Sequence, residues 1–275
     1  MLVGIVGLGL IGGSMGLALQ NTKLVKRVVG FDHNVAHCEE ALRLNLVNEI
    51  VDFDDIKKCD VIFLAIPVDA IMAAMKNLVD VSGDTTIIDL GSTKEQIVNE
   101  TPQVLKKNFI PAHPMTGTEK TGPGAAFATL YNGGIVVICK SKEVEDIHLT
   151  RAVQIFSHIG MKIFFMNPKE HDRHASYISH MPHALSYALA NSVMRQEDPK
   201  SILILAGGGF KDMSRVAKSS PVMWSNIFKQ NKQNFLDALT NFQAELEKCK
   251  TMVEKEQWAE LEEWMKNATT LHKIL

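Results

Sequence analysis

Residues 3–20 read VGIVGLGLIGGSMGLALQ and place a glycine-rich turn between an apolar strand and a helical run. Gly7, Gly9 and Gly12 have the spacing of a turn that binds a dinucleotide pyrophosphate when a strand precedes it and a helix follows. We expect Gly7 to permit the tight turn, Gly9 to let the backbone approach the phosphates, and Gly12 to let the helix pack closely on the strand. The stretch predicts an α/β nucleotide-binding fold.

The next two elements indicate which dinucleotide is bound. The helix after the turn begins at Leu10 and Ile11, whose free N–H groups would face the phosphates. A second apolar run, VKRVVGFD, ends at Asp32, about 20 residues after the glycines, where this fold uses an acid to bind the adenosine ribose hydroxyls. Its carboxylate would repel a 2′-phosphate, and the following His33 and Asn34 supply no arginine to hold one. NAD is therefore favoured over NADP as the cofactor.

The order of apolar runs predicts the domains. Up to about Phe165, short β-branched runs alternate with helical stretches, a pattern typical of a parallel sheet covered on both faces. After Asn167 the patterns are almost wholly helical. We predict a doubly wound, parallel-sheet NAD-binding (Rossmann) domain over residues 1–166 and an all-helical substrate and dimerisation domain over residues 167–275. A few long helices make a small core, so we expect a homodimer to bury the rest of their apolar face.

Composition narrows the class of protein. With 46% hydrophobic and 22% charged residues, the 275-residue chain has the profile of a soluble globular protein. The net charge of -2 gives no electrostatic reason to expect nucleic acid or an anionic membrane as a partner. Four scattered cysteines indicate reduced thiols in the cytoplasm rather than disulfides or a zinc site. The apolar N-terminus lacks a basic segment and is interrupted by glycines, which argues against both a signal peptide and a membrane span.

Two further strand ends are expected to face the cofactor. In AIPVDAI, Ile66 and Pro67 lie where the chain would turn out over the bound dinucleotide. In DLGSTK, Ser92 follows the next strand and is a candidate hydrogen-bonding residue near the nicotinamide. Both positions fall at carboxyl ends of parallel strands, where ligands of open α/β sheets bind. Ser92 also precedes a helical run with Glu95, so it is equally suited to cap that helix, and the two roles are compatible.

A glycine-rich stretch, HPMTGTEKTGPG, occupies residues 113–124. The run NFIPA before it is predicted to be a strand, so we expect a loop that leaves the carboxyl edge of the sheet beside the cofactor. There His113 could accept a proton near its ordinary pKa of about 6.5 while hydride leaves the same carbon, as alcohol oxidation requires. The alternative is that His113 only caps a turn before Pro114.

Five segments, in this order, resemble the prephenate dehydrogenase family of tyrosine biosynthesis. They are GLGLIGGS, DLGSTK, HPMTGTEKTG, SHMPHALSYAL and GGGFKDMSRVAKSSPVMW. The resemblance runs from Gly4 to about Lys232, and the last three segments are far more specific than the glycine pattern. It implies oxidation of prephenate with NAD, loss of carbon dioxide and formation of 4-hydroxyphenylpyruvate. The chain resembles the minimal, single-function member, without a fused chorismate mutase or a C-terminal regulatory domain.

The resemblance also implies roles for individual residues. His113 matches the histidine that bonds the ring hydroxyl, and Ser92 the serine close to that histidine and the nicotinamide. Arg215 matches the arginine that binds a substrate carboxylate, which a planar bidentate donor suits. Lys211 would share a helical face with Arg215 and pair with Glu119, within one subunit or across a dimer, to gate the pocket. The alternative for the two cations is a solvated basic face. Other substrate-binding residues expected on the loop are Gly117 and Thr118.

Four histidines, His171, His174, His180 and His183, form two pairs at three-residue spacing, which metal ligands can have. No cysteine accompanies them, hydride transfer here needs no Lewis acid, and Pro182 disturbs the helical register between the pairs, so we expect no metal. The resemblance makes His183 a substrate-pocket residue that faces the nicotinamide domain. His180 is expected to be structural and hydrogen-bonded near the domain interface, and the other two to be surface or interface residues.

Three alternatives stay open on the sequence. An arogenate or dual-specificity cyclohexadienyl dehydrogenase would accept an amino group where prephenate has a keto oxygen. A β-hydroxyacid dehydrogenase shares the two-domain plan, but such enzymes usually rely on a catalytic lysine in the helical domain, and the HPMTGTE loop argues against them. A NAD-sensing regulatory protein without turnover is the third, and the presence of His113, Ser92 and Arg215 counts against it.

Overall fold

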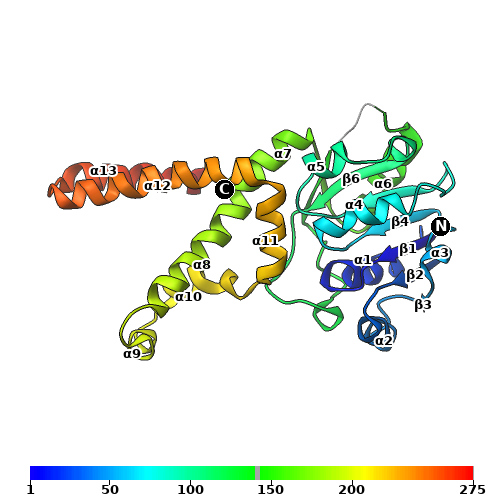
Figure 1. Ribbon diagram of the computed structural model, residues 1–275, viewed down its shortest axis with the longest axis horizontal. Helices are drawn as coiled ribbons and strands as arrows, with labels where there is room; N and C mark the ends of the chain where they lie inside the picture. Colours follow the sequence, from blue (N-terminus) through cyan, green and yellow to red (C-terminus); the bar gives the residue numbers. More distant parts are fainter. Residues whose placement is uncertain (140–142, 275) are drawn as a thin grey trace.

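The computed structural model, shown in Figure 1, describes residues 1–139 and 143–274, so Leu275 of the predicted helical domain lies outside the described residues. Its N-terminal part is an eight-stranded sheet in the order β3-β2-β1-β4-β5-β6-β7-β8. The order reverses between β1 and β4, the kind of switch point at which doubly wound sheets bind ligands. The strands are β1 (Leu2–Val6), β2 (Arg27–Phe31), β3 (Glu49–Ile50), β4 (Val61–Leu64), β5 (Thr86–Asp89), β6 (Phe109–Pro114), β7 (Ile135–Cys139) and β8 (Lys162–Met166).

The sheet departs from the predicted parallel arrangement at its last two strands. Strands β1 to β6 run in one direction, whereas β7 pairs antiparallel with β6, and β8 runs parallel to β7. Between β6 and β7 the chain returns through a long connection with only one short 3-10 turn, Pro123–Ala125. A strand reached without a crossover helix pairs antiparallel, which explains the reversal. Strand β3, which has only two residues, was not predicted either.

Helices cover both faces of the sheet, as predicted for a doubly wound fold. Each face has its own buried apolar core, and the strands between the two cores are apolar on both sides. One face packs against α1 (Leu10–Gln20), α2 (Val35–Arg43) and α6 (Asp146–His158). The other packs against α3 (Phe53–Ile56), α4 (Val68–Lys76) and α5 (Glu95–Asn99).

The glycine-rich turn has the backbone that its sequence predicts. Gly7 has a φ of 93°, in the left-handed region, and a Cβ there would lie 2.5 Å from the carbonyl oxygen of Ala65. A Cβ on Gly12 would collide with the carbonyl oxygen of Gly7, so α1 can approach β1 this closely only without a side chain. The turn and the close helix packing expected of Gly7 and Gly12 are confirmed.

Beyond β8 the described chain is helical. The helix α7 (Pro168–Ala175), a π-helical turn (Ser176–His180) and α8 (Met181–Met194) follow one another without a break. The π turn lies directly before Pro182, whose missing N–H would interrupt a regular α-helix. We propose the change from β8 to α7, near Asn167, as the domain boundary. The later helices are α9 (Pro199–Ile204), α10 (Gly208–Ser214), α11 (Pro221–Gln230), α12 (Lys232–Glu254) and α13 (Trp258–Thr269).

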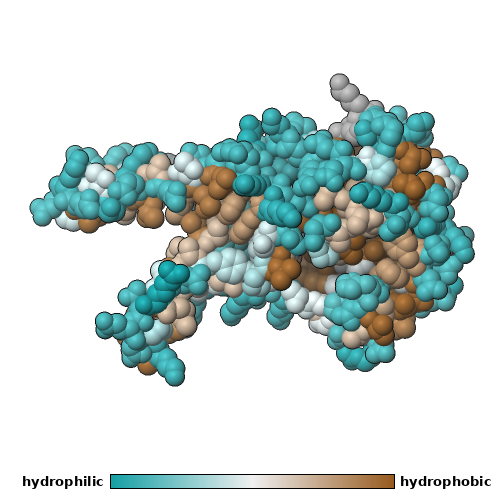
Figure 2. All heavy atoms as spheres, viewed as in Figure 1, coloured by the Kyte–Doolittle hydropathy of each residue, from teal (hydrophilic) through white to brown (hydrophobic). Residues whose placement is uncertain are grey.

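The outer helices expose much of their apolar face. Figure 1 shows α12 and α13 projecting away from the sheet, and Figure 2 shows apolar side chains along the hollow between them and the arm formed by α8 to α10. Among the residues described, Ala238 is the only buried residue of α12, and α13 has none. Exposed apolar side chains of this region include Ile178, Met194, Ile204, Leu205, Leu246, Val253 and Trp258. None of the described helices is both long and apolar enough to cross a membrane.

A buried ion pair holds the turn that carries Ser92. Asp89 ends β5, Lys94 precedes α5, and the Lys94 ammonium donates to the Asp89 carboxylate with both side chains fully buried. The carboxylate also accepts from the N–H of Gly91 at 2.6 Å. Burial raises the pKa of Asp89, while the charge and hydrogen bond of Lys94 act in the opposite direction. Because neither charge is stable here without the other, the pair ties the start of the turn to its end.

Replacing Lys94 with Met should destabilise the fold by about 3–5 kcal/mol, because the Asp89 carboxylate would stay buried without its partner. The double variant Asp89→Asn, Lys94→Met removes both charges and should recover most of that loss. Urea unfolding followed by circular dichroism measures both changes. A Lys94→Met variant as stable as the wild type would mean that the pair contributes nothing to the folded state.

Candidate active site

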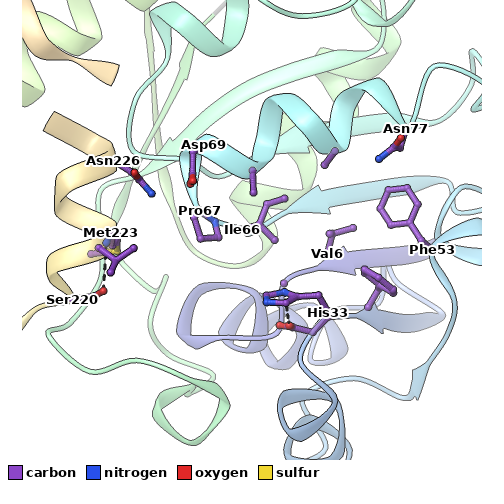
Figure 3. A pocket seen from close by; sticks show the side chains of 16 residues that line it. Val6, His33, Phe53, Ile66, Pro67, Asp69, Asn77, Ser220, Met223 and Asn226 are labelled. Carbon is purple, nitrogen blue, oxygen red and sulfur yellow. Dashed lines mark hydrogen bonds and ion pairs between the residues drawn. The ribbon is translucent and has the colours of Figure 1, made fainter. Parts of the chain in front are cut away.

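A cavity of about 700 Å³ lies at the carboxyl ends of β1, β2 and β4. Figure 3 shows Met223 and Asn226 of α11 facing the start of α4 at Pro67 across this cavity. Residues predicted for a cofactor site that line it are Gly7, Asp32, Ile66 and Pro67. Lining residues that the sequence analysis missed are Ser220, Val222, Met223 and Asn226, at the start of α11. Three of them belong to the segment GGGFKDMSRVAKSSPVMW, but no local pattern places them at the cavity, because only the packing of the helical part against the sheet brings them here.

The glycine turn leaves room for a ligand. Nothing lies within 4 Å of the position that a Cβ of Gly9 would occupy. Gly9 is also the N-cap of α1 without a side-chain cap, and no acidic residue lies in the first turn of that helix. The first N–H groups of α1, at Leu10 and Ile11, therefore keep their capacity to donate to a ligand. The open backbone and the positive end of the helix fit the pyrophosphate of a dinucleotide.

The carboxylate of Asp32 lies beside this turn. Its side chain is only 6% exposed, and it accepts hydrogen bonds from the N–H of Leu8 at 2.8 Å and the N–H of Asn34 at 2.9 Å. The Nδ1 atoms of His33 and His37 lie 3.3 and 3.4 Å from its oxygens. Asp32 thus links the glycine turn to the start of α2 while it lines the cavity.

Ser92 follows β5, and His113 lies near the end of the neighbouring strand β6, at the same edge of the sheet. The pairing of β5 with β6 reaches Asp89 and Pro111, so Ser92 lies three residues and His113 two residues beyond the last pair. Ser92 is half-buried, and it has no hydrogen-bond partner within the described part of the chain. Lys94, not Ser92, is the N-cap of α5 and makes no side-chain cap, so the alternative role of Ser92 as a cap is wrong.

Asp172 of α7, in the helical part of the chain, caps the N-terminus of α5 instead. Its Oδ1 accepts from the N–H of Lys94 at 2.8 Å, and its Oδ2 accepts from the N–H of Glu95 at 2.9 Å. Because a carboxylate from α7 already satisfies these N–H groups, Ser92 is not needed there. No sequence pattern predicts this contact, because it joins residues far apart in the chain.

His113 is part of a strand rather than of the loop that we expected. Past Pro111, β6 continues and pairs antiparallel with β7, with His113 opposite Val137. The chain leaves the sheet only after the N–H of Met115 has donated to the carbonyl of Ile135 at 2.8 Å. The strand pairing therefore holds the backbone of His113 in place, and the alternative that His113 only caps a turn before Pro114 is wrong.

A second histidine contacts His113 directly. The Nδ1 atom of His113 lies 2.8 Å from the Nε2 atom of His171, which is 2% exposed and lies between the two parts of the molecule. His171 is therefore an interdomain core residue and not a surface residue, whereas His174 is exposed. Burial lowers the pKa of His113 well below its usual value, and the positive charge of Lys94 adds to the effect. The pKa of His113 is therefore lower than the value near 6.5 that we expected.

The loop after β6 reaches the helical part through Glu119. Its carboxylate lies 3.3 Å from a guanidinium nitrogen of Arg215, so within one subunit Glu119 pairs with Arg215 rather than with Lys211, and pairing with Lys211 across a dimer stays a prediction. Lys211 lies in α10, and Arg215 is the C-cap of that helix and begins the 3-10 turn Arg215–Lys218. A hydrogen bond from its own backbone and the charge of Arg215 lower the pKa of Glu119. Exposed residues of this region are Gly117, Thr118 and Lys211.

Two histidines of the helical part pack on Trp224, which the sequence analysis did not single out. The ring of His183 stacks on the indole at 3.6 Å, and its Nδ1 lies 2.9 Å from the carbonyl oxygen of Ser179, to which it donates. Burial lowers the pKa of His183. His180 is fully buried, hydrogen-bonded to Asn231 as expected of a structural residue, and burial lowers its pKa to about 4. Within residues 1–139 and 143–274, no three His, Cys, Asp or Glu side chains are grouped to hold a metal.

Comparison with known proteins covers both parts of the chain. Residues 15–165 match the model of the prephenate dehydrogenase nucleotide-binding domain, and residues 167–267 match that of the prephenate dehydrogenase dimerization domain. The chain is 30% identical over 271 residues to the prephenate dehydrogenase of Bacillus subtilis, and the match covers 96% of this chain and 73% of that protein.

Solved structures show the same similarity. The prephenate dehydrogenase from A. aeolicus, in complex with hydroxyphenyl propionate and NAD+, has a TM-score of 0.92 at 31% identity, and the match covers 99% of this chain and 97% of that one. The arogenate dehydrogenase of Synechocystis has a TM-score of 0.82 at 27% identity, with 99% of each chain covered. This protein therefore belongs to the prephenate dehydrogenase family.

Proposed function

We propose that the chain catalyses the NAD-dependent oxidative decarboxylation of prephenate to 4-hydroxyphenylpyruvate, a step of L-tyrosine biosynthesis. The observation that carries the proposal is the placement of His113, a half-buried imidazole kept neutral at the carboxyl edge of the nucleotide-binding sheet. Oxidation of an alcohol needs such a base for the hydroxyl proton as hydride leaves the same carbon. The relatives from Bacillus subtilis and A. aeolicus, both prephenate dehydrogenases, support this substrate.

The cofactor site is proposed to hold NAD rather than NADP. The open backbone at Gly9 and the N–H groups of Leu10 and Ile11 would bind the pyrophosphate. The Asp32 carboxylate would bind the ribose hydroxyls and repel a 2′-phosphate. Bound NAD would supply the acceptor for the hydride. Ser92 and His113 do not line the cavity. We therefore propose that the cavity holds the adenosine half of NAD and that the nicotinamide half lies nearer the centre of the sheet edge.

His113 and Ser92 are proposed to act on the ring hydroxyl of the substrate. His113 accepts the hydroxyl proton, and the half-buried Ser92 hydroxyl, free of other partners in the described chain, orients the same oxygen and the nicotinamide. When carbon dioxide leaves, its bonding electrons enter the ring, and the oxygen that lost its proton can take it back from His113. Oxidation and decarboxylation together release no net proton, so a buried base with little access to water is sufficient.

Charged residues of the helical domain are proposed to bind the rest of the substrate. Arg215 binds a substrate carboxylate bidentately, in place of or beside Glu119. The Nε2 atom of His183 would act as an acceptor for the substrate, because its Nδ1 donates to Ser179. Lys211 has the least support as a substrate-binding residue, since it is exposed and has no partner in the described residues. Loop residues proposed to line the pocket beside Glu119 are Gly117 and Thr118.

The match to a dimerization domain supports a homodimer formed through the helical domain. The apolar side chains that α12 and α13 leave exposed are the surface that we propose a second copy covers. The four cysteines are all free, which fits the proposed location in the reducing cytoplasm.

Arogenate is the second candidate substrate. The Synechocystis relative is an arogenate dehydrogenase, and the Glu119 carboxylate beside Arg215 could bind the amino group that arogenate carries in place of the keto oxygen of prephenate. The family assignment removes the β-hydroxyacid dehydrogenase alternative. Measured turnover of a substrate would exclude the remaining alternative, a non-catalytic NAD sensor.

Purified protein incubated with NAD and prephenate should form NADH and 4-hydroxyphenylpyruvate, followed by absorbance and by chromatography of the product. Arogenate should react at a lower kcat/KM, and NADP should support less turnover than NAD because Asp32 repels its 2′-phosphate. Equal use of NADP would contradict the role of Asp32, and a preference for arogenate would favour the second candidate. Tight NAD binding without turnover of either substrate would identify a sensor.

Replacing Arg215 with Ala should raise KM for prephenate about 10- to 100-fold, since a hydrogen bond to a charged group contributes about 1.5–3 kcal/mol. We expect an increase in KM near the lower end, about 10-fold, because the Arg215 side chain is 57% exposed and solvent weakens its interactions. KM for NAD should change little. Arg195→Ala, an exposed arginine of the same domain, is the matched control. Unchanged KM for prephenate would place Arg215 on a solvated face.

His113→Asn keeps a hydrogen-bonding side chain but cannot take up a proton near neutral pH. The loss should fall on kcat, roughly 10²–10⁴-fold, with KM for NAD nearly unchanged. Because the pKa of His113 is lowered, wild-type kcat/KM should persist as the pH falls below about 6.5 and decline only when His113 takes up a proton. That acid limb should disappear in the variant. Near-normal kcat in His113→Asn would show that the proton goes elsewhere.

A further inference from the structure

Asp172 is a buried carboxylate whose hydrogen-bond partners determine its role. Both oxygens accept backbone N–H groups, those of Lys94 and Glu95, at 2.8 and 2.9 Å. The Oδ1 atom also lies 2.8 Å from the Nδ1 atom of His171. A carboxyl group is a far stronger acid than an imidazolium, with ordinary pKa values of about 3.9 and 6.5, so the proton between them resides on the ring. His171 therefore donates its Nδ1–H to Asp172.

This assignment extends to the next ring. A neutral imidazole has one N–H and one lone pair, so a neutral His171 that donates at Nδ1 accepts at Nε2. The atom 2.8 Å from that Nε2 is Nδ1 of His113, and the two rings meet edge to face with their planes at 71°. Only one proton can lie between two nitrogen atoms. His113 therefore carries its hydrogen on Nδ1 and has a bare lone pair on Nε2.

The remaining nitrogen of His113 is the one available to a substrate. Its Nε2 atom has no hydrogen-bond partner among the residues that the structure describes, and the side chain is half-buried rather than sealed. The partners on the other side are firmly held, since the side chain of Asn231 donates to the backbone carbonyl of Asp172 at 2.7 Å. His113 belongs to β6, whereas His171 and Asp172 belong to α7, so the chain of contacts crosses the domain boundary.

We infer that Asp172 and His171 are positioning residues that hold His113 in the Nδ1–H tautomer, with the Nε2 lone pair facing the substrate hydroxyl. The inference rests on the proposed role of His113 as the base. The two residues never touch the reacting atoms. They determine which nitrogen of His113 is free, and they do so only when the helical domain is packed against the sheet.

The pair Asp172→Asn and Asp172→Ala is the sharpest test. The Oδ1 atom of Asp172 serves both the N–H of Lys94 and Nδ1 of His171, so the amide oxygen of Asn in that place keeps both contacts and only the acceptor for the N–H of Glu95 is lost. Asp172→Ala removes the acceptor for His171, so nothing holds the hydrogen of His171 on Nδ1, and the Nε2–H tautomer of His113, which cannot accept the substrate proton, becomes populated. We expect the Ala variant to lose at least about tenfold more kcat than the Asn variant, with KM for NAD little changed.

A pair of substitutions at His171 separates tautomer control from packing. In His171→Gln the amide oxygen can accept from Nδ1–H of His113 and preserve its tautomer, whereas His171→Leu offers no acceptor. The Gln variant should retain at least about tenfold more kcat than the Leu variant, because a positioned general base contributes about 10²–10⁴-fold. His174→Gln, an exposed histidine of the same helix, is the matched control and should behave as the wild type. Equal kcat values for the Gln and Leu variants would overturn the inference.

Nitrogen-15 NMR of histidine-labelled protein reads the tautomer without relying on activity. The His113 signals should indicate Nδ1–H in the wild type, in His171→Gln and in Asp172→Asn, and a population of Nε2–H in Asp172→Ala. An unchanged His113 tautomer with unchanged kcat in Asp172→Ala would overturn the inference. If His113→Asn itself kept normal kcat, the role of His113 as the base would fail instead, while the NMR result would still decide which residues set its tautomer. Should Asp172→Ala not fold, the His171 pair gives the answer.

Discussion

The carboxylate of Asp172 is the contact on which both halves of the candidate site depend. It caps α5 through the N–H groups of Lys94 and Glu95, and it holds His171 against His113. A helix of five residues has few internal hydrogen bonds, so an external acceptor for its first N–H groups matters more than it would in a long helix. Because that acceptor comes from α7, the turn that carries Ser92 and the strand end that carries His113 are both held against the helical domain.

Burial divides the charged groups of the site into two kinds. The Asp89–Lys94 pair is fully buried and unavailable to a ligand, and its value is structural, because either charge alone would be costly in that place. The Glu119–Arg215 pair is partly exposed, and such pairs contribute little free energy. Exchange of Glu119 for a substrate carboxylate therefore costs little. Burial also determines the charge of His113, because it lowers the pKa of the ring and so keeps His113 neutral and able to accept a proton.

The helical domain serves both the site and the proposed dimer with different faces. Trp224 and Ile227 of α11 are buried against Val68 of α4, so this helix is fixed beside the cavity. The later helices, α12 and α13, have almost no buried residues of their own in the part of the chain described. Their exposed apolar residues form the surface that we propose a second copy covers.

The amino-acid sequence by itself determined the features that depend on local geometry or on repeated pattern. The spacing of Gly7, Gly9 and Gly12 follows from steric limits within one turn, and alternating apolar runs specify a sheet with helices on both faces. The tertiary structure alone decided which residues meet across long separations. It reversed β7, paired Glu119 with Arg215, brought α11 to the cavity and placed His171 and Asp172 behind His113. These contacts depend on how two separately patterned domains pack, and no periodicity within either domain records that packing.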